Sequence, residues 1–158
     1  MKLEIKIYPA KVLRQKARPV EKITSEVQDI IHQMIKLMKK HDGVGLAANQ
    51  VGVLKQIIVI MTGSGPLALI NPEIIFRQGE REEEEGCLSL PGVIVRVKRA
   101  EEIKVRALDK KGMEIVLQAN GLPARAIQHE IDHLQGKLII DYLNFWQKRK
   151  IKLAVKDE

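Results

Sequence analysis

The stretch QHEIDHLQG, residues 128–136, has the residue types and the spacing of a metal site. His129 and His133 are four positions apart, so on a helix both imidazoles lie on one face and can hold a single ion. Glu130 directly follows the first of them. The alternative is two ordinary helix histidines beside a surface glutamate. Because two protein ligands rarely complete a metal site, a third ligand decides between these interpretations.

The third ligand is expected from upstream in the chain. The extended zinc-protease pattern, H-E-x-x-H-x-x-G-x-x-H, is matched through its glycine, but its last position is Ile139, and little chain remains beyond it. Upstream, the segment EGCLSLPG at 85–92 carries Cys87, the only cysteine in the sequence. A thiolate is a strong ligand for iron or zinc. The alternative, a buried cysteine acting as a small hydrophobe, fits poorly between a glycine and a Ser-Leu-Pro-Gly turn.

A third unusual segment, GVGLAANQVG at residues 43–52, is rich in small residues. It lacks the Lys and the preceding strand of a phosphate-binding loop. Close approach of a ligand is one interpretation, and a helix end followed by small-residue packing is the other. Gln50 is the polar exception, and its side-chain amide can donate a hydrogen bond into a cleft.

Helices that could position these residues are predicted by the apolar pattern. The first is expected to begin at Ser25, which has capping-box spacing with Gln28, and to end at Gly43. Its apolar residues recur at helical period: Val27, Ile30, Ile31, Met34 and Met38. The second is expected to begin near Pro123 and to end at Gly136. There Ile127, Ile131 and Leu134 form an apolar stripe, and both histidines fall on another flank.

Short β-branched runs between the two helices predict strands at 56–61, 67–72, 73–76 and 92–97. The runs at 102–109 and 113–118 are joined across KKG like a hairpin. A short basic helix is expected to close the chain. One helix, several strands and then a helix is an α+β order rather than that of a doubly wound sheet. Without repeats or long linkers, residues 1–158 are expected to form one domain.

Composition and charge are those of a soluble globular protein, with 45% apolar and 30% charged residues. No apolar run approaches the roughly eighteen residues of a membrane span, and the N-terminal residues do not form a secretory signal, so a cytoplasmic protein is expected. The net charge is +7. Its densest basic cluster, QKRKIK at 147–152, is a solvated helix end or a phosphate contact. The acidic run at 80–85 is a solvated loop or edge-strand face, except for Glu85 beside the Cys87 motif.

Together, GVGLAANQ, EGCLS and QHEIDHL, in this order and at this spacing, resemble the three signature motifs of the peptide deformylases. The similarity runs from the N-terminal segment through Asp141, and the departures are the short loop at 63–67 and the short C-terminal helix. The resemblance implies short antiparallel strands packed around the helix that carries the two histidines. It also implies removal of the formyl group from the N-terminal formylmethionine of new chains, which releases formate.

The resemblance further implies a role for individual residues. Cys87, His129 and His133 would hold one divalent ion, usually Fe²⁺ and replaceable by Ni²⁺, Co²⁺ or Zn²⁺, with one position left for water. Glu130 would take the proton of that water and pass it to the leaving amine. The side-chain amide of Gln50 and the backbone N–H of Leu88 would stabilise the charge that develops on the formyl oxygen.

Substrate contacts follow from the same resemblance. The backbone of Gly45 would pair with the peptide, and an apolar pocket for methionine would involve Val44, Leu88, Leu122 and Ala126. Arg125 would line the pocket entrance or simply face solvent. The expected partners are N-formylmethionyl nascent peptides and, through the basic C-terminal segment, the ribosome surface. Neither a membrane nor a specific nucleic-acid sequence is expected as a partner.

Two rival classes remain open from the sequence. A metallopeptidase would share the hydrolytic chemistry but attack an internal amide, and the thiolate ligand from upstream argues against it. A non-catalytic ribosome-associated module would use the basic surface, but it would not need Cys87, Gln50 and Glu130 together.

Overall fold

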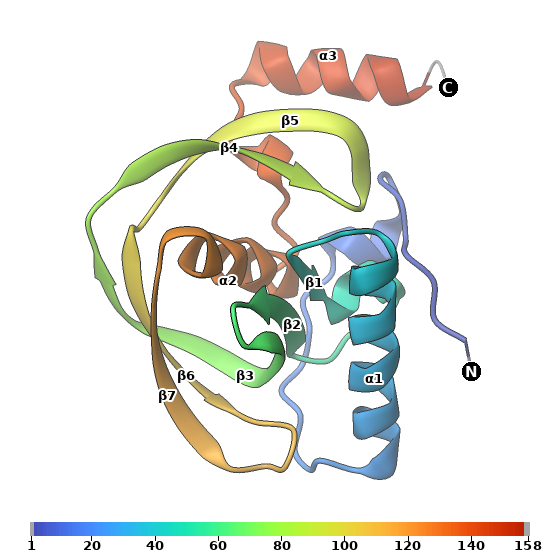
Figure 1. Cartoon of the computed structure of the whole chain (residues 1–158). Coiled ribbons are helices and arrows are strands. Elements are labelled where there is room, and N and C mark those ends of the chain that lie inside the picture. The colour runs from blue at the N-terminus through green and yellow to red at the C-terminus, as the bar shows by residue number, and fades with distance from the viewer. Residues whose placement is uncertain (1, 157–158) are drawn as a thin grey trace.

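Strands curve around one helix in this computed structural model, which describes the backbone of residues 2–156 and side chains as far as residue 151 (Figure 1). The helices are α1 (Ser25–Lys40), α2 (Gly121–Leu134) and α3 (Phe145–Lys156), with 3-10 turns η1 (Lys11–Arg14), η2 (Ala48–Val51) and η3 (Ile139–Tyr142). The strands are β1 (Gly45–Ala47), β2 (Ile57–Thr62), β3 (Gly65–Gln78), β4 (Arg81–Cys87), β5 (Leu90–Arg99), β6 (Glu102–Leu108) and β7 (Glu114–Asn120). The predicted α+β class is confirmed.

Antiparallel pairing organises the strands of the described chain into two sheets. One has the order β1-β2-β3-β6-β7, and the other is the pair β4-β5. The predicted hairpin is confirmed, because β6 and β7 pair from Glu102↔Asn120 to Leu108↔Glu114. The two runs predicted at 67–72 and 73–76 are instead parts of the single strand β3, whose pairing with β6 shifts between Ile70 and Glu73. The acidic run forms most of β4.

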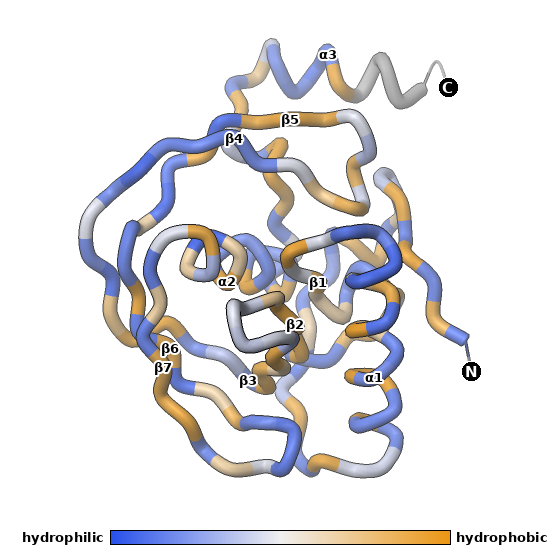
Figure 2. Tube along the Cα trace, in the orientation of Figure 1, coloured by the Kyte–Doolittle hydropathy of each residue, from blue (hydrophilic) through white to orange (hydrophobic). Residues whose placement is uncertain are grey.

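The helix α1 is amphipathic, as predicted, and all five of its predicted apolar residues are buried. In Figure 2 its trace alternates between hydrophobic and hydrophilic residues, as expected for a helix with one face on the core. The predicted capping box of Ser25 and Gln28 is wrong. The cap is Thr24, whose Oγ1 accepts a hydrogen bond from the backbone N–H of Val27 at 3.2 Å. The helix ends at Lys40, earlier than Gly43.

Strand β2 lies between two hydrophobic clusters. Ile57 and Val59 pack with the apolar face of α1, whereas Ile58 and Ile60 pack with Ile127 of α2. Successive residues of a strand point to opposite faces, so a continuous apolar run is what burial on both faces requires. The strand therefore separates α1 from α2.

The position of α2 determines where its histidines lie. The helix begins at Gly121, two residues before Pro123, which occupies its first turn. Its apolar side packs on the five-stranded sheet, and its N-terminal end follows directly from β7. A third cluster joins β5 to η1 and η3 and includes Leu13, Val97 and Ile139. None of the helices in the described chain is long and apolar enough to cross a membrane.

Candidate metal centre and active site

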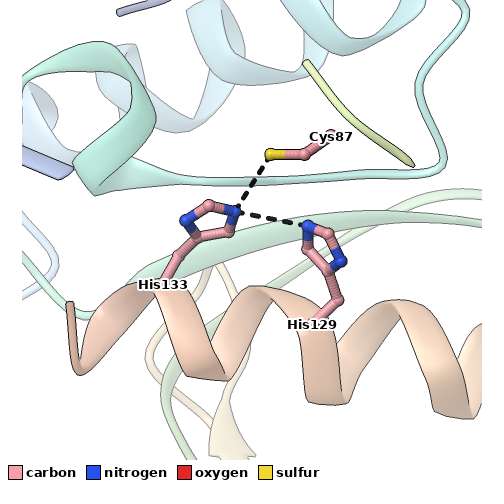
Figure 3. A group of neighbouring side chains, drawn as sticks. All are labelled: Cys87, His129 and His133. Atoms are coloured by element: carbon pink, nitrogen blue, oxygen red, sulfur yellow. Dashed lines mark hydrogen bonds between the residues drawn. The ribbon is translucent and has the colours of Figure 1, made fainter. Parts of the chain in front are cut away.

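Three potential metal ligands converge between α2 and the β4–β5 hairpin (Figure 3). The Nε2 atom of His133 lies 3.4 Å from Cys87 Sγ and 3.3 Å from His129 Nε2. The ligand atoms of all three residues lie within 4.8 Å of one another. The structure thus brings the upstream cysteine to the histidine pair, as the sequence predicted, and a single ion fits among the three.

Local backbone structure directs each of these side chains. The two histidines are one helical turn apart on α2, which puts both rings on the same face. Cys87 ends β4, where the pairing with β5 shifts between Glu85 and Cys87. A bulge at this point allows the buried Glu85 carboxylate and the Cys87 thiol to approach the same helix from neighbouring positions in the chain.

The orientation of His129 is fixed by Glu85. The Nδ1 atom of His129 lies 2.9 Å from Glu85 Oε1. An ionised carboxylate can only accept, so Nδ1 carries the proton and the lone pair of Nε2 is left for an ion. A carboxylate behind a histidine ligand is a common arrangement in metal sites and sets both tautomer and ring orientation.

Two arginines keep Glu85 ionised. Arg99 donates to both of its carboxylate oxygens, each at 2.9 Å, and Arg125 Nη1 donates to Oε2 at 2.6 Å. Burial alone would raise the pKa of Glu85, but the hydrogen bonds and charges of Arg99 and His129 outweigh burial and lower the pKa to about 2. The carboxylate is therefore a permanent acceptor behind His129.

The electrostatics of the centre favour a cation. Burial lowers the pKa of His129, yet the negative groups around it, above all Glu130, raise that pKa well above its usual value. Burial and the neighbouring His129 lower the pKa of His133 well below its usual value, so this imidazole is neutral and able to bind a metal. Negative groups close to His129, a neutral His133 and a thiol together suit a divalent ion.

Glu130 is placed for proton transfer. Its side chain is buried, its Oε1 has no hydrogen-bond partner among the described residues, and its Oε2 lies 4.0 Å from His129 Nε2. Burial raises the pKa of Glu130 to about 7, despite the lowering effect of His129 and Arg99. A carboxyl group that titrates near neutral pH can both accept and return a proton.

A pocket of about 330 Å³ opens beside these groups. Except for His133, all of the residues predicted for the site line it: Val44, Gly45, Gln50, Cys87, Leu88, Leu122, Ala126, His129 and Glu130. Ala126 is buried, whereas the exposed side chains of Val44 and Leu122 form the rim. Arg125 also lines the pocket and is buried, so the alternative that it faces solvent is wrong.

Gln50 directs its amide nitrogen toward the thiol. Its Oε1 accepts a hydrogen bond from the backbone N–H of Ala47 at 2.9 Å, which assigns the oxygen and nitrogen ends of the amide. The Nε2 group then lies 3.5 Å from Cys87 Sγ and 3.2 Å from Ser89 Oγ. A donor thus lies at the edge of the ligand cluster, as the sequence predicted.

The sequence model of the polypeptide deformylases matches residues 2–149 of this chain. The chain belongs to this family. A peptide deformylase of Thermoanaerobacter pseudethanolicus is 49% identical over 145 residues, covering 89% of this chain and 91% of that protein. One of Thermodesulfovibrio yellowstonii is 50% identical over 147 residues, covering 90% and 89%.

Solved deformylase structures agree with this assignment. The crystal structure of a peptide deformylase from Legionella pneumophila superposes with a TM-score of 0.93 at 38% identity, covering 99% of this chain and 95% of that one. The α+β architecture that was predicted from the sequence is therefore also that of the solved deformylase structure.

Arg99, the buried partner of Glu85 behind the metal centre, was not predicted from the sequence. A signal was present, because Val95 and Val97 are buried and alternate with exposed Arg96 and Lys98 along β5. The period of two puts position 99 on the buried face, where an arginine needs an acidic partner. Glu85, noted as exceptional within the acidic run, is that partner.

Proposed function

We propose that this chain removes the formyl group from the N-terminal formylmethionine of nascent peptides and releases formate, with residues 1–158 acting as one catalytic domain. The observation that carries the proposal is the cluster of Cys87, His129 and His133 next to buried Glu130, beside a pocket, in a chain of the deformylase family. Such a constellation supplies a metal site, a proton carrier and a place for a side chain.

The chemistry is hydrolysis of a formamide. A divalent ion held by Cys87, His129 and His133 would supply Lewis acidity and make water acidic enough to attack near neutral pH. As the oxygen of the attacking water bonds to the formyl carbon, Glu130 accepts one of that water's protons. The carbon–nitrogen bond then breaks, and Glu130 returns the proton to the departing amine. The products are formate and a free N-terminal methionine.

Other residues stabilise and orient the reacting groups. Gln50 Nε2 and the backbone N–H of Leu88 donate to the formyl oxygen as it gains negative charge. The backbone of Gly45, in the edge strand β1, pairs with the peptide. Val44, Leu88, Leu122 and Ala126 provide the apolar surface for the methionine side chain.

The proposal is tested by the product and by the bond that is cut. Metal-loaded protein is incubated with an N-formylmethionyl tripeptide, with the same peptide acetylated at its N-terminus, and with a longer acetylated peptide. Formate from the first substrate, no acetate from the second and no shorter peptides from the third are expected. Internal cleavage without formate would instead identify a metallopeptidase and overturn the proposal.

The ion proposed for the cell is Fe²⁺, although one thiolate and two imidazoles also suit Zn²⁺, Ni²⁺ and Co²⁺. A ferrous ion beside a thiolate is oxidised by air, and damage then falls on Cys87 as sulfenic or higher acids. Iron-loaded protein should lose activity in air while nickel-loaded protein keeps it, and mass spectrometry should find the added oxygen on Cys87. Equal lifetimes would contradict an iron–thiolate centre.

A thiolate ligand also suits the reducing cytoplasm, and we propose this location for the chain. Cell fractionation tests it.

We further propose that the basic segment 147–152 contacts the ribosome. Arg149 and Lys150 are exposed on α3, and the side chain of Lys152 lies outside the described residues. Reversing Arg149 and Lys150 to Glu should weaken ribosome binding and reduce its salt dependence. The same reversal of Lys110 and Lys111, in the β6–β7 turn, is the matched control. Unchanged binding after reversal on α3 would overturn this contact.

A further inference from the structure

Arg99 connects the metal centre to the segment that follows α2. Its side chain is buried at the end of β5, and its Nε and Nη2 groups donate to the two oxygens of Glu85. Its remaining terminal nitrogen, Nη1, donates to Asp132 Oδ2 at 2.6 Å and to the hydroxyl of Tyr142 at 3.0 Å. The planar guanidinium group is therefore hydrogen-bonded to Glu85 on one side and to Asp132 and Tyr142 on the other.

Tyr142 completes this arrangement from η3. Its hydroxyl donates to Asp132 Oδ2 at 2.6 Å, and its ring lies 4.9 Å from the guanidinium carbon of Arg99. Asp132 stands directly before His133 on α2. Arg99 is therefore fixed relative to the helix that carries both histidines and relative to the turn that follows it.

Neutralising Glu85 does not by itself explain Arg99. Arg125 already supplies one positive charge to the same carboxylate, at 2.6 Å. What Arg99 adds is a two-point contact, because its parallel N–H groups bind both oxygens and prevent the carboxylate from rotating. One of those oxygens, Oε1, is the acceptor for His129 Nδ1. Rotation of the carboxylate would move that acceptor and release the imidazole.

We propose that Arg99, held by Asp132 and Tyr142, is a positioning residue that fixes the orientation of His129 through Glu85. The inference rests on the metal site of the proposed function, and it extends that site to η3. Arg99 contacts neither the metal ligands nor the pocket beside them, and it reaches His129 through the Glu85 carboxylate.

The test measures metal binding in the full chain. Arg99→Lys keeps the charge and loses the two-point contact, and Tyr142→Phe keeps the ring and loses the hydroxyl. Metal-free proteins are titrated with Co²⁺, and both the dissociation constant and the visible spectrum of the bound ion are recorded. Loss of a partner behind a metal ligand typically costs 10–100-fold in affinity, so Arg99→Lys should weaken binding by about tenfold or more and shift the spectrum. Tyr142→Phe should act in the same direction with a smaller effect.

Matched controls separate positioning from loss of stability. Tyr8→Phe alters the only other tyrosine of the sequence. Asp141 lies in the same 3-10 turn as Tyr142 and forms an ion pair with Arg14, and Asp141→Asn removes its charge. Both should leave Co²⁺ affinity and spectrum unchanged, even where the melting temperature falls. A lower melting temperature with wild-type Co²⁺ affinity and spectrum in Arg99→Lys and Tyr142→Phe would show a merely structural role and overturn the proposal.

A double-mutant cycle tests the route through Glu85. If Arg99 acts through this carboxylate, Arg99→Lys should have little further effect on Co²⁺ affinity in a Glu85→Gln background. Losses of Co²⁺ affinity that add in the double variant would overturn the proposal. If Arg99→Lys does not fold, a cycle of Tyr142→Phe with Glu85→Gln decides the question in the same way. Because Co²⁺ binding requires no substrate, these results stand apart from the formate assay, whose failure in the wild type would reject the proposed function alone.

Discussion

At the scale of single residues, Glu130 allows metal binding and proton transfer to be separated. Glu130→Gln preserves size and helix propensity and removes no metal ligand. The turnover number should fall at least about a hundredfold, because positioned acid–base groups contribute typically 10²–10⁴-fold. Substrate affinity should change much less, since the pocket for methionine is intact. Formate release and metal content are measured on the same purified samples.

His133→Ala provides the contrast, because it should lose metal and activity together. A fully metallated Glu130→Gln protein with near-normal turnover would show that another group carries the proton.

Gly45 leaves room for the carboxylate of Glu130. A Cβ atom at this position would lie 2.6 Å from Glu130 Oε2 and 3.0 Å from its Cγ. Because Glu130 is buried, the carboxylate has to shift, and a displacement of about 1 Å in a catalytic group can cost on the order of a hundredfold in rate. Gly45→Ala should therefore reduce turnover strongly while the protein still binds metal. Gly63→Ala, where the new Cβ meets no described atom within 4 Å, is the control and should be fully active. Equal activity of the two variants would contradict this role.

At the scale of elements, the start of α1 offers a direct comparison of two neighbouring hydroxyls. Thr24 accepts the hydrogen bond from Val27, whereas Ser25 is exposed in the first turn. Thr24→Ala should lower the free energy of unfolding by about 1 kcal/mol, the usual cost of losing a helix cap. Ser25→Ala should change it by less than half of that. Urea unfolding measures both, and the reverse ranking would restore Ser25 as the cap.

Elements with a clear period could be predicted from the sequence. The apolar positions of α1 have helical spacing, and the β6–β7 runs are joined by a short turn, so local patterns were sufficient. The motifs also predicted which side chains meet, because Cys87 was the only thiol available as a third ligand. The residue types of the metal centre were therefore accessible without a structure.

Elements that depend on tertiary pairing could not be predicted in the same way. The break expected within β3 is a local irregularity at Asn71, which has a positive φ of 53° and precedes a proline, and the strand continues past it because β6 pairs on both sides. The cap of α1 is Thr24 rather than Ser25, because either of these adjacent hydroxyl residues suits the N-cap position. Arg99 was missed because its partners, Glu85, Asp132 and Tyr142, come from three other elements.

At the scale of the whole molecule, a metal ion would join the β4–β5 hairpin to α2. An ion that binds only the folded chain stabilises it, by about 4.1 kcal/mol when its free concentration is a thousand times the dissociation constant. Chelation should therefore lower the melting temperature of the wild-type protein. Cys87→Ala removes the ligand that belongs to the hairpin, so its melting temperature should respond much less to the chelator. Equal responses would show that the ion stabilises the chain from another site.

The separation of the ligands along the chain also has a consequence for biosynthesis. His133 follows Cys87 by 46 residues, and the helix that carries it is made after every strand of both sheets. During translation the thiol therefore exists before either imidazole, and no partial chain that ends before α2 can form the centre. Capture of Co²⁺ by a refolding chain should likewise report the docking of α2 against the hairpin, and stopped-flow absorbance would time that step.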